Sequence, residues 1–208
     1  MRILSSILSK TNQRYGYYPN RYQYQQQELA DASRVEHILG QLDGITPLGR
    51  TITPIKVHGL NFNCTTTEVS KQLGKPLAKL VNPELEKHSI MLYQTRFFNK
   101  KVKLVFHFLD SLLFMAEYQF YQLNTTEQDD LSNMLISKFG CLLPFASEPQ
   151  KITDAQGNAL AIQQDVYTHF YYVGHNSREA CEYFQANSME ARLAIERKEQ
   201  EQYWKQII

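Results

Sequence analysis

The chain has 208 residues, 43 % of them hydrophobic and 21 % charged, which is typical of a globular protein with a substantial core. Its net charge of +1 argues against an overall nucleic-acid-binding charge, and its sparse glycine and proline (9 and 7 residues) argue against a long fibrous or disordered region. Aromatic side chains are in excess, with 13 Tyr and 11 Phe, and such side chains bury large areas and are enriched at interfaces.

The small net charge hides an asymmetry along the chain. Residues 1–110 hold 15 Lys and Arg against 8 Asp and Glu, whereas residues 111–208 hold 7 against 13. Opposite charges of this kind would let two copies, or two parts of one copy, attract each other. Chance scatter of charges over a folded surface is the alternative explanation.

The three cysteines and the apolar segments bear on the compartment. Cys64, Cys141 and Cys181 are far apart and show no C-x-x-C spacing, which argues against a disulfide framework and against a structural zinc site. No segment approaches the run of about 18 apolar residues that spans a membrane. Ser5 and Ser6 interrupt the apolar cluster near the start, so we expect no secretory signal. These features favour a cytoplasmic protein with reduced thiols.

Residues 1–27 are predicted to form a basic arm rich in Tyr and Gln. The arm has four basic side chains, five tyrosines and no acid. It could stack on single-stranded nucleic acid while its arginines meet phosphates. Because four charges are few and no known nucleic-acid module follows, we favour an arm that lies on its own domain or on a protein partner. Its candidate partner-binding residues are Arg14, Tyr17, Tyr18 and Arg21.

A core domain is predicted over residues 28–176. Its first helix runs from about Gln26 to Leu42, where apolar residues recur at helical spacing, and Asp43-Gly44 ends it. The next segment contains several prolines and glycines and is expected to be extended, with a short strand around Ile52–Val57.

Two further helices have clear end signals. Thr65 and Glu68 form a capping box at the start of a short helix, which Gly74 stops. A third helix begins at 124–127, again with capping chemistry, and Gly140 closes it. The residues expected to bury its apolar face are Leu131, Met134, Leu135 and Phe139.

The aromatic-rich residues 89–123 are predicted to form three consecutive antiparallel strands. Apolar side chains alternate with polar ones in three segments, separated by turn residues at Asn99-Lys100 and Asp110-Ser111. A hairpin over 151–160 and an aromatic strand over 166–173 follow. We therefore predict an α+β fold, in which helices pack on one face of an antiparallel sheet of about five strands, with one well-buried face.

Residues 177–208 are predicted to form a protruding C-terminal helical extension. The helix is very polar from residue 192 onward, and hydrophobicity returns only at its end. We interpret this apolar tip as a protein-binding element. Its candidate partner-binding residues are Tyr203, Trp204 and Ile207.

Signatures of catalysis are missing from the sequence. It contains no phosphate-binding loop, no dinucleotide-binding glycine pattern, no zinc-protease helix motif and no nucleophile elbow. The six histidines lack metal-ligand spacing. His107 and His169 both fall in predicted strands and could approach each other near Asp110, although packed strand histidines are the commoner case. We predict no catalytic residue, metal or cofactor; a polar pocket around either histidine would favour an enzyme instead.

Residues 57–123 carry a family resemblance. The residues that carry it are Val57-His58-Gly59-Leu60, Thr67-Glu68-Val69, Leu73-Gly74-Lys75-Pro76, Tyr93 and Phe106-x-Phe108. They resemble the pattern of the small SmpA/OmlA-type lipoproteins and of the related β-lactamase-inhibitor-protein-like modules. The resemblance implies a short helical pair on a three-stranded antiparallel sheet and a role in binding other proteins. Asp110-Ser111-Leu112 replaces the family's Gly-x-Leu, and the lipoprotein signal is missing, so membrane anchoring does not carry over.

These observations lead to two functional hypotheses. The first is a non-enzymatic protein-binding module, such as an assembly factor, a chaperone or an immunity-type protein, whose partner is another protein or a second copy of the chain. The alternative is a nucleic-acid-associated protein that binds through the arm of residues 1–27. Neither hypothesis involves a membrane.

Overall fold

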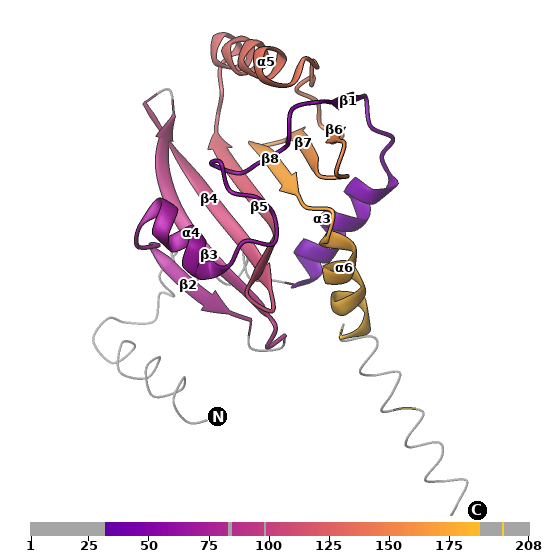
Figure 1. Cartoon of the computed structure of the whole chain (residues 1–208). Coiled ribbons are helices and arrows are strands. Elements are labelled where there is room, and N and C mark those ends of the chain that lie inside the picture. The colour runs from indigo at the N-terminus through magenta and orange to yellow at the C-terminus, as the bar shows by residue number, and fades with distance from the viewer. Residues whose placement is uncertain (1–31, 83–84, 98, 188–196, 198–208) are drawn as a thin grey trace, which may run out of the picture.

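The computed structural model describes residues 32–82, 85–97, 99–187 and 197 (Figure 1). The described helices are α3 (Ala32–Gly44), α4 (Thr66–Leu73), α5 (Thr125–Phe139) and α6 (Ser177–Ala186). The strands are β1 (Gly49–Thr51), β2 (Ala78–Val81), β3 (His88–Phe97), β4 (Lys100–Leu109), β5 (Leu112–Tyr121), β6 (Gln150–Asp154), β7 (Ala159–Gln164) and β8 (Tyr167–Val173). The fold is α+β, as predicted.

All of these strands belong to one mixed sheet of eight strands in the order β1-β6-β7-β8-β5-β4-β3-β2. The single parallel pair joins β1 to β6, and the other pairs are antiparallel. The predicted number of about five antiparallel strands was too low, because the short strands β1 and β2 show little periodicity in the sequence. The strand predicted at Ile52–Val57 is wrong: β1 ends at Thr51, and Ile52 is 99 % exposed.

Helices cover both faces of this sheet, which corrects the prediction of helices on one face. We call the face that α4 and α5 contact the α5 face, and the opposite one the α3 face, because α3 and α6 pack there. Neighbouring strand residues alternate between them: Phe170 packs in the cluster with α5, and Tyr171 in the cluster with α3. Val105 and His107, which alternate along β4 with residues of the α5 face, are also fully buried, so both faces of β4 are covered.

The ends of α4 and α5 confirm the predicted capping chemistry. The Glu68 backbone N–H donates to the Thr65 hydroxyl, and the Thr65 N–H donates to the Glu68 carboxylate. Asn124 and Glu127 make the same reciprocal pair at the start of α5. At the end of α5, Gly140 has a φ of 69°, in the left-handed region that glycine adopts without strain.

Two units of similar construction follow each other along the chain. A capped helix, α4, precedes the antiparallel meander β2-β3-β4-β5, and a second capped helix, α5, precedes the shorter meander β6-β7-β8. The last strands of the two meanders, β5 and β8, pair antiparallel in the middle of the sheet. Both helices lie on the same face (Figure 1). Outward from this central pair, each unit continues with its earlier strands, and the first unit has one strand more, β2.

The beginning of the predicted C-terminal extension packs on the core. α6 places Ala180 and Phe184 in the cluster on the α3 face, where both are buried. None of the helices in the described ranges combines the length and the apolar character that a membrane crossing needs.

Candidate functional site

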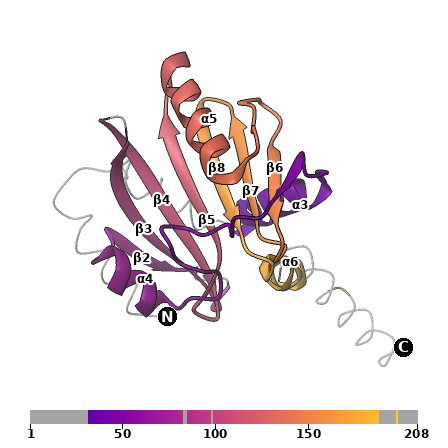
Figure 2. The ribbon, with the colours of Figure 1, turned by 45° about the horizontal axis from the view of Figure 1, so that its top comes forward.

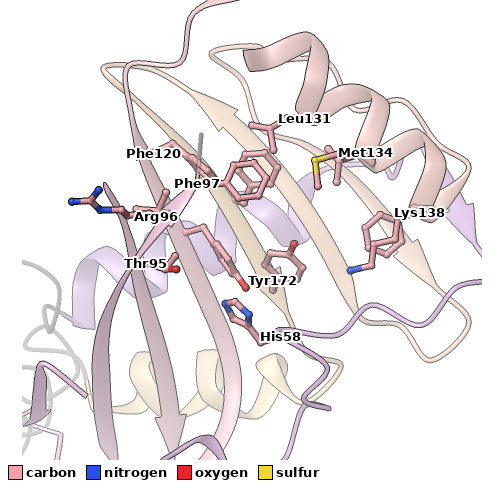
Figure 3. Close-up of a pocket in the computed structure, with 14 residues that line it drawn as sticks. His58, Thr95, Arg96, Phe97, Phe120, Leu131, Met134, Lys138 and Tyr172 are labelled. Carbon is pink, nitrogen blue, oxygen red and sulfur yellow. The ribbon is translucent and has the colours of Figure 1, made fainter. Parts of the chain in front are cut away.

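A cavity of about 370 Å³ lies between α5 and the α5 face of the sheet (Figure 3). Figure 2 shows α5 lying across β5 and β8, and the cavity continues from there to β4 and β3. Its walls are mainly apolar. The larger apolar side chains around it are Phe97, Phe120, Leu131, Leu135, Phe139 and Phe170.

Local sequence features explain why this space stays open. Leu131, Leu135 and Phe139 recur at a spacing of four and turn one side of α5 toward the sheet. Under the helix, the sheet is filled by large rings. Toward β3 the side chains extend less far from the sheet, because the directly opposed residues Thr95 and Val102 are small. The pocket is the space that remains because aromatic rings keep α5 at a distance from the sheet, while the small side chains of Thr95 and Val102 do not fill the region beside them.

One end of the pocket is polar. The ring of His58 stacks on Tyr118 with centroids 5.6 Å apart, and the rings of Tyr118 and Tyr172 are 5.1 Å apart. The Lys138 ammonium lies 4.9 Å from the centroid of the Phe139 ring and, in Figure 3, the Lys138 side chain extends from α5 toward the cavity. The polar end therefore offers one cation beside rings that carry hydrogen-bonding groups.

The surroundings keep the groups at this end in their neutral forms. Burial, together with the nearby charge of Lys138, lowers the pKa of His58. Burial raises the pKa of Tyr172 to about 12, and it raises that of Tyr118 as well. At neutral pH the imidazole and both phenols are uncharged, and they act as hydrogen-bonding groups rather than as charged ones.

At its other end the pocket reaches the outer part of β3. Thr95, Arg96 and Phe97 line it there, beyond Leu92, the last β3 residue that pairs with β2. Met134 of α5 also lines the pocket and is 52 % exposed. Met134 was predicted to be buried with the core stripe of α5, but helical spacing does not reveal that the sheet falls away beneath it.

A buried ionic cluster occupies the α3 face. Arg34 of α3 donates two hydrogen bonds of 2.7 Å to the fully buried carboxylate of Glu117, and His169 Nδ1 lies 2.7 Å from the same carboxylate. Burial alone would raise the pKa of Glu117, but the hydrogen bond with His169 and the charge of Arg34 bring it down to about 2. The cluster ties α3 to β5 and β8, so its role is structural.

His107 and His169 do not come together near Asp110, which corrects that prediction. His107 Nδ1 lies 3.3 Å from His88 Nε2, with the two buried rings parallel to within 3°. His169 contacts Glu117, and Asp110 pairs with Lys87. Neither His107 nor His169 lines the pocket. Within the described ranges, no group of acidic, His and Cys side chains has an arrangement that would hold a metal ion.

The partner-binding residues proposed from the sequence all lie outside the described residues, so their roles stay predictions. They are Arg14, Tyr17, Tyr18, Arg21, Tyr203, Trp204 and Ile207. The pocket residues were missed because large aromatic side chains on strands are read as core. The local signal that could have found the pocket is the small pair Thr95 and Val102 among large rings, but strand pairing must be known before it can be seen.

Comparisons with protein-family models, with curated proteins and with solved structures return no match. The resemblance of residues 57–123 to the SmpA/OmlA-type lipoproteins and the β-lactamase-inhibitor-protein-like modules therefore stays a prediction.

Proposed function

We propose that the protein is a non-enzymatic protein-binding module, and that the pocket under α5 receives apolar side chains of its partner. The observation that carries this proposal is the pocket itself. Its volume of about 370 Å³ falls in the usual range of binding sites. A cavity of about 150 Å³ holds a benzene molecule, so this pocket has room for about two ring-sized groups.

Two features of the rim favour a partner protein over a free small molecule. The pocket adjoins the outer part of β3, where backbone groups are available that only another polypeptide chain can use as a strand. Met134 exposes half of its surface beside the opening, and methionine adapts its shape to the side chains of a partner. Both features extend the contact surface beyond what a small ligand would cover.

The chemistry of the polar end supports binding rather than reaction. The neutral imidazole of His58 and the neutral phenols of Tyr118 and Tyr172 suit hydrogen bonding to a partner's polar groups. Cys64 does not line the pocket, and burial raises the pKa of its thiol to about 11, so this thiol is not a ready nucleophile at neutral pH. An assembly factor, a chaperone and an immunity-type protein would all use such a surface.

The test compares two substitutions on the same helix. Met134 and Ile136 are 52 % and 42 % exposed, but only Met134 lines the pocket. Met134→Trp fills the rim of the pocket, and Ile136→Trp adds the same ring away from it. We expect a partner, captured from the native host and then purified, to bind Met134→Trp at least about tenfold more weakly than the native protein and Ile136→Trp equally well, as measured by calorimetry.

Two outcomes would contradict the proposal. One is a purified partner that binds Met134→Trp as tightly as the native protein, while both variants show native circular dichroism and thermal unfolding. The other is native mass spectrometry that finds a small apolar molecule bound to the protein and lost from Met134→Trp, with no protein partner sensitive to that substitution. The second result would assign the pocket to a small ligand.

A further inference from the structure

We infer that the partner segment is acidic and that it binds as an additional strand along the outer edge of β3, directly beyond the end of β2. This inference rests on the proposed function of the pocket and adds the mode of binding and the chemistry of the partner. It follows from the length of β3, from the direction of its backbone groups and from the charges beside them.

The outer part of β3 is an open edge. β2 pairs with β3 only from Ser89 to Leu92, whereas β3 continues to Phe97. On that side of β3, no strand among the described ranges pairs with residues 93–97. The opposite side of these residues is fully paired with β4. An added strand would extend the line of β2 without displacing any described strand.

The hydrogen bonds at the start of β3 show which backbone groups face this edge. On the β2 side, the carbonyls of His88 and Leu92 accept from Asn82 and Leu77. On the β4 side, the carbonyl of Lys87 accepts from Asp110. Even-numbered residues of β3 therefore point their backbone groups toward the β2 side, because the direction alternates along a strand.

Gln94 and Arg96 continue this even-numbered series beyond the end of β2. Their N–H and C=O groups are thus directed toward the open edge, and both residues are exposed. These four backbone groups are the donors and acceptors that an incoming strand would use.

The side chains of β3 place the pocket beside this edge. Thr95 and Phe97 line the pocket. Because side chains alternate between the faces of a sheet, every second residue of an added strand would project toward the α5 face, where the pocket lies. Apolar residues at those positions would reach it. The intervening residues would project toward the α3 face.

The charge at the α3 face indicates what those intervening residues are. Arg96 and Lys101 lie directly opposite each other on β3 and β4, and both are exposed. Arg96 borders the pocket, but Figure 3 shows that its side chain points away from it. Neither cation takes part in an ion pair within the described ranges. Like charges directly opposite in a sheet repel each other, and acidic side chains on an added strand would relieve this repulsion.

The same charges argue against a second copy of this chain as the occupant. Pairing of two β3 edges would bring two sets of Arg96 and Lys101 together, and cationic edge residues are a common device against such self-pairing. An acidic segment of a different protein meets no such repulsion. The partner chemistry is therefore an extended segment in which acidic residues alternate with apolar ones.

The probe is a synthetic peptide of about six residues, the usual strand length, in which glutamate alternates with phenylalanine or leucine. We expect it to bind the full-length protein in fluorescence anisotropy, and more weakly as salt rises. N-methylation of the amides that face β3 should weaken binding at least about tenfold, because it removes backbone hydrogen bonds. A peptide with lysine in place of glutamate should bind the native protein poorly, and the double substitution Arg96→Glu with Lys101→Glu should reverse this preference.

A matched pair of variants tests the edge from the side of the protein. Gln94→Pro removes an N–H that faces the open edge and leaves the β4 pairing in place, whereas Gln94→Ala keeps that N–H. We expect Gln94→Pro to lower the affinity for the glutamate peptide by about tenfold and Gln94→Ala to leave it unchanged. If Gln94→Pro fails to fold, the N-methylated peptide answers the same question with the native protein.

The outcomes separate this inference from the proposed function. An N-methylated peptide that binds as tightly as its parent, while Met134→Trp weakens both, would overturn the strand mode and leave the pocket as a binding site. Alternatively, N-methylation and Gln94→Pro could each lower the binding affinity while Met134→Trp leaves it unchanged. That result would support strand addition at the edge and count against the pocket. Failure of the glutamate peptide to bind, or equal binding of the lysine peptide, would overturn the acidic strand while the capture experiment still tests the pocket.

Discussion

Glu117 shows how a single buried charge links distant parts of this chain. Its carboxylate is fully buried, and Arg34 and His169, from α3 and β8, surround it. Its pKa of about 2 lies below the ordinary value of 4.5, so the folded state holds the ionised form more strongly than the unfolded chain does. The stability that this group contributes is complete above about pH 4.5 and is lost as the pH falls toward 2.

Replacing Glu117 by Gln should lower the free energy of unfolding by about 3 kcal/mol at pH 7, because Arg34 is left beside a neutral group in a buried site. Urea unfolding measures this change. The control is Glu182→Gln, which removes the exposed pair with Arg178 and should cost less than about 0.5 kcal/mol. Glu117→Gln should also flatten the loss of stability between pH 4.5 and 2. Equal costs for the two substitutions would contradict a structural role for the cluster.

The stacked pair His88 and His107 predicts a second, separate acid response. Burial lowers the pKa of His88 from 6.5 to about 4, and it lowers that of His107 too. The unfolded chain binds more protons in this window, so stability should fall as the pH drops from about 6.5 to 4, by roughly 3 kcal/mol for His88. Unfolding of the double variant His88→Gln with His107→Gln should depend less on pH there. His37→Gln, at an exposed histidine of α3, is the control and should behave like the native protein.

At the scale of the elements, local chemistry was predictable and tertiary contacts were not. The capping boxes of α4 and α5 involve residues three apart, so the sequence alone located both helix starts. The open edge of β3 depends on where β2 stops, and the four residues of β2 are too few for a periodic signal. The pocket likewise depends on which strands lie under α5, which no local pattern specifies. The three long strands were predicted because each alternates over ten residues.

For the whole molecule, the sequence indicated an α+β class but not a sheet covered on both sides. On β4, Lys103 and His107 alternate with apolar residues, a pattern that is typical of a sheet with one solvent-exposed face. Instead, α3 and α6 cover part of that face, and His107 finds its ring partner in His88. The burial of His107 and Glu117 could not be predicted, because their partners are distant in the sequence. His88 lies 19 residues from His107, and Arg34 lies 83 residues from Glu117.

The architecture predicts a gradient of stability across the sheet. β4 lies between β3 and β5 and has residues buried on both faces, whereas β1 and β2 are the outermost strands. Amides of β4 should therefore exchange hydrogen only through global unfolding, and those of β2 through local opening. Hydrogen-exchange mass spectrometry of peptides covering 100–109 and 78–81 checks this expectation. Equal protection of the two segments would contradict it.

The central pairing of β5 with β8 also bears on how such a chain can arise. Antiparallel pairing of equivalent strands is compatible with a two-fold axis, so two separate copies of one capped helix and its meander could make the same joint. A lone unit would leave its last strand as an open edge, and a second copy would close it. Apart from β2, which has no counterpart in the second unit, the order of elements is what tandem duplication of a gene for such a symmetric dimer, followed by fusion, would produce. After fusion each half is free to diverge, and here only the second half has its helix over the pocket.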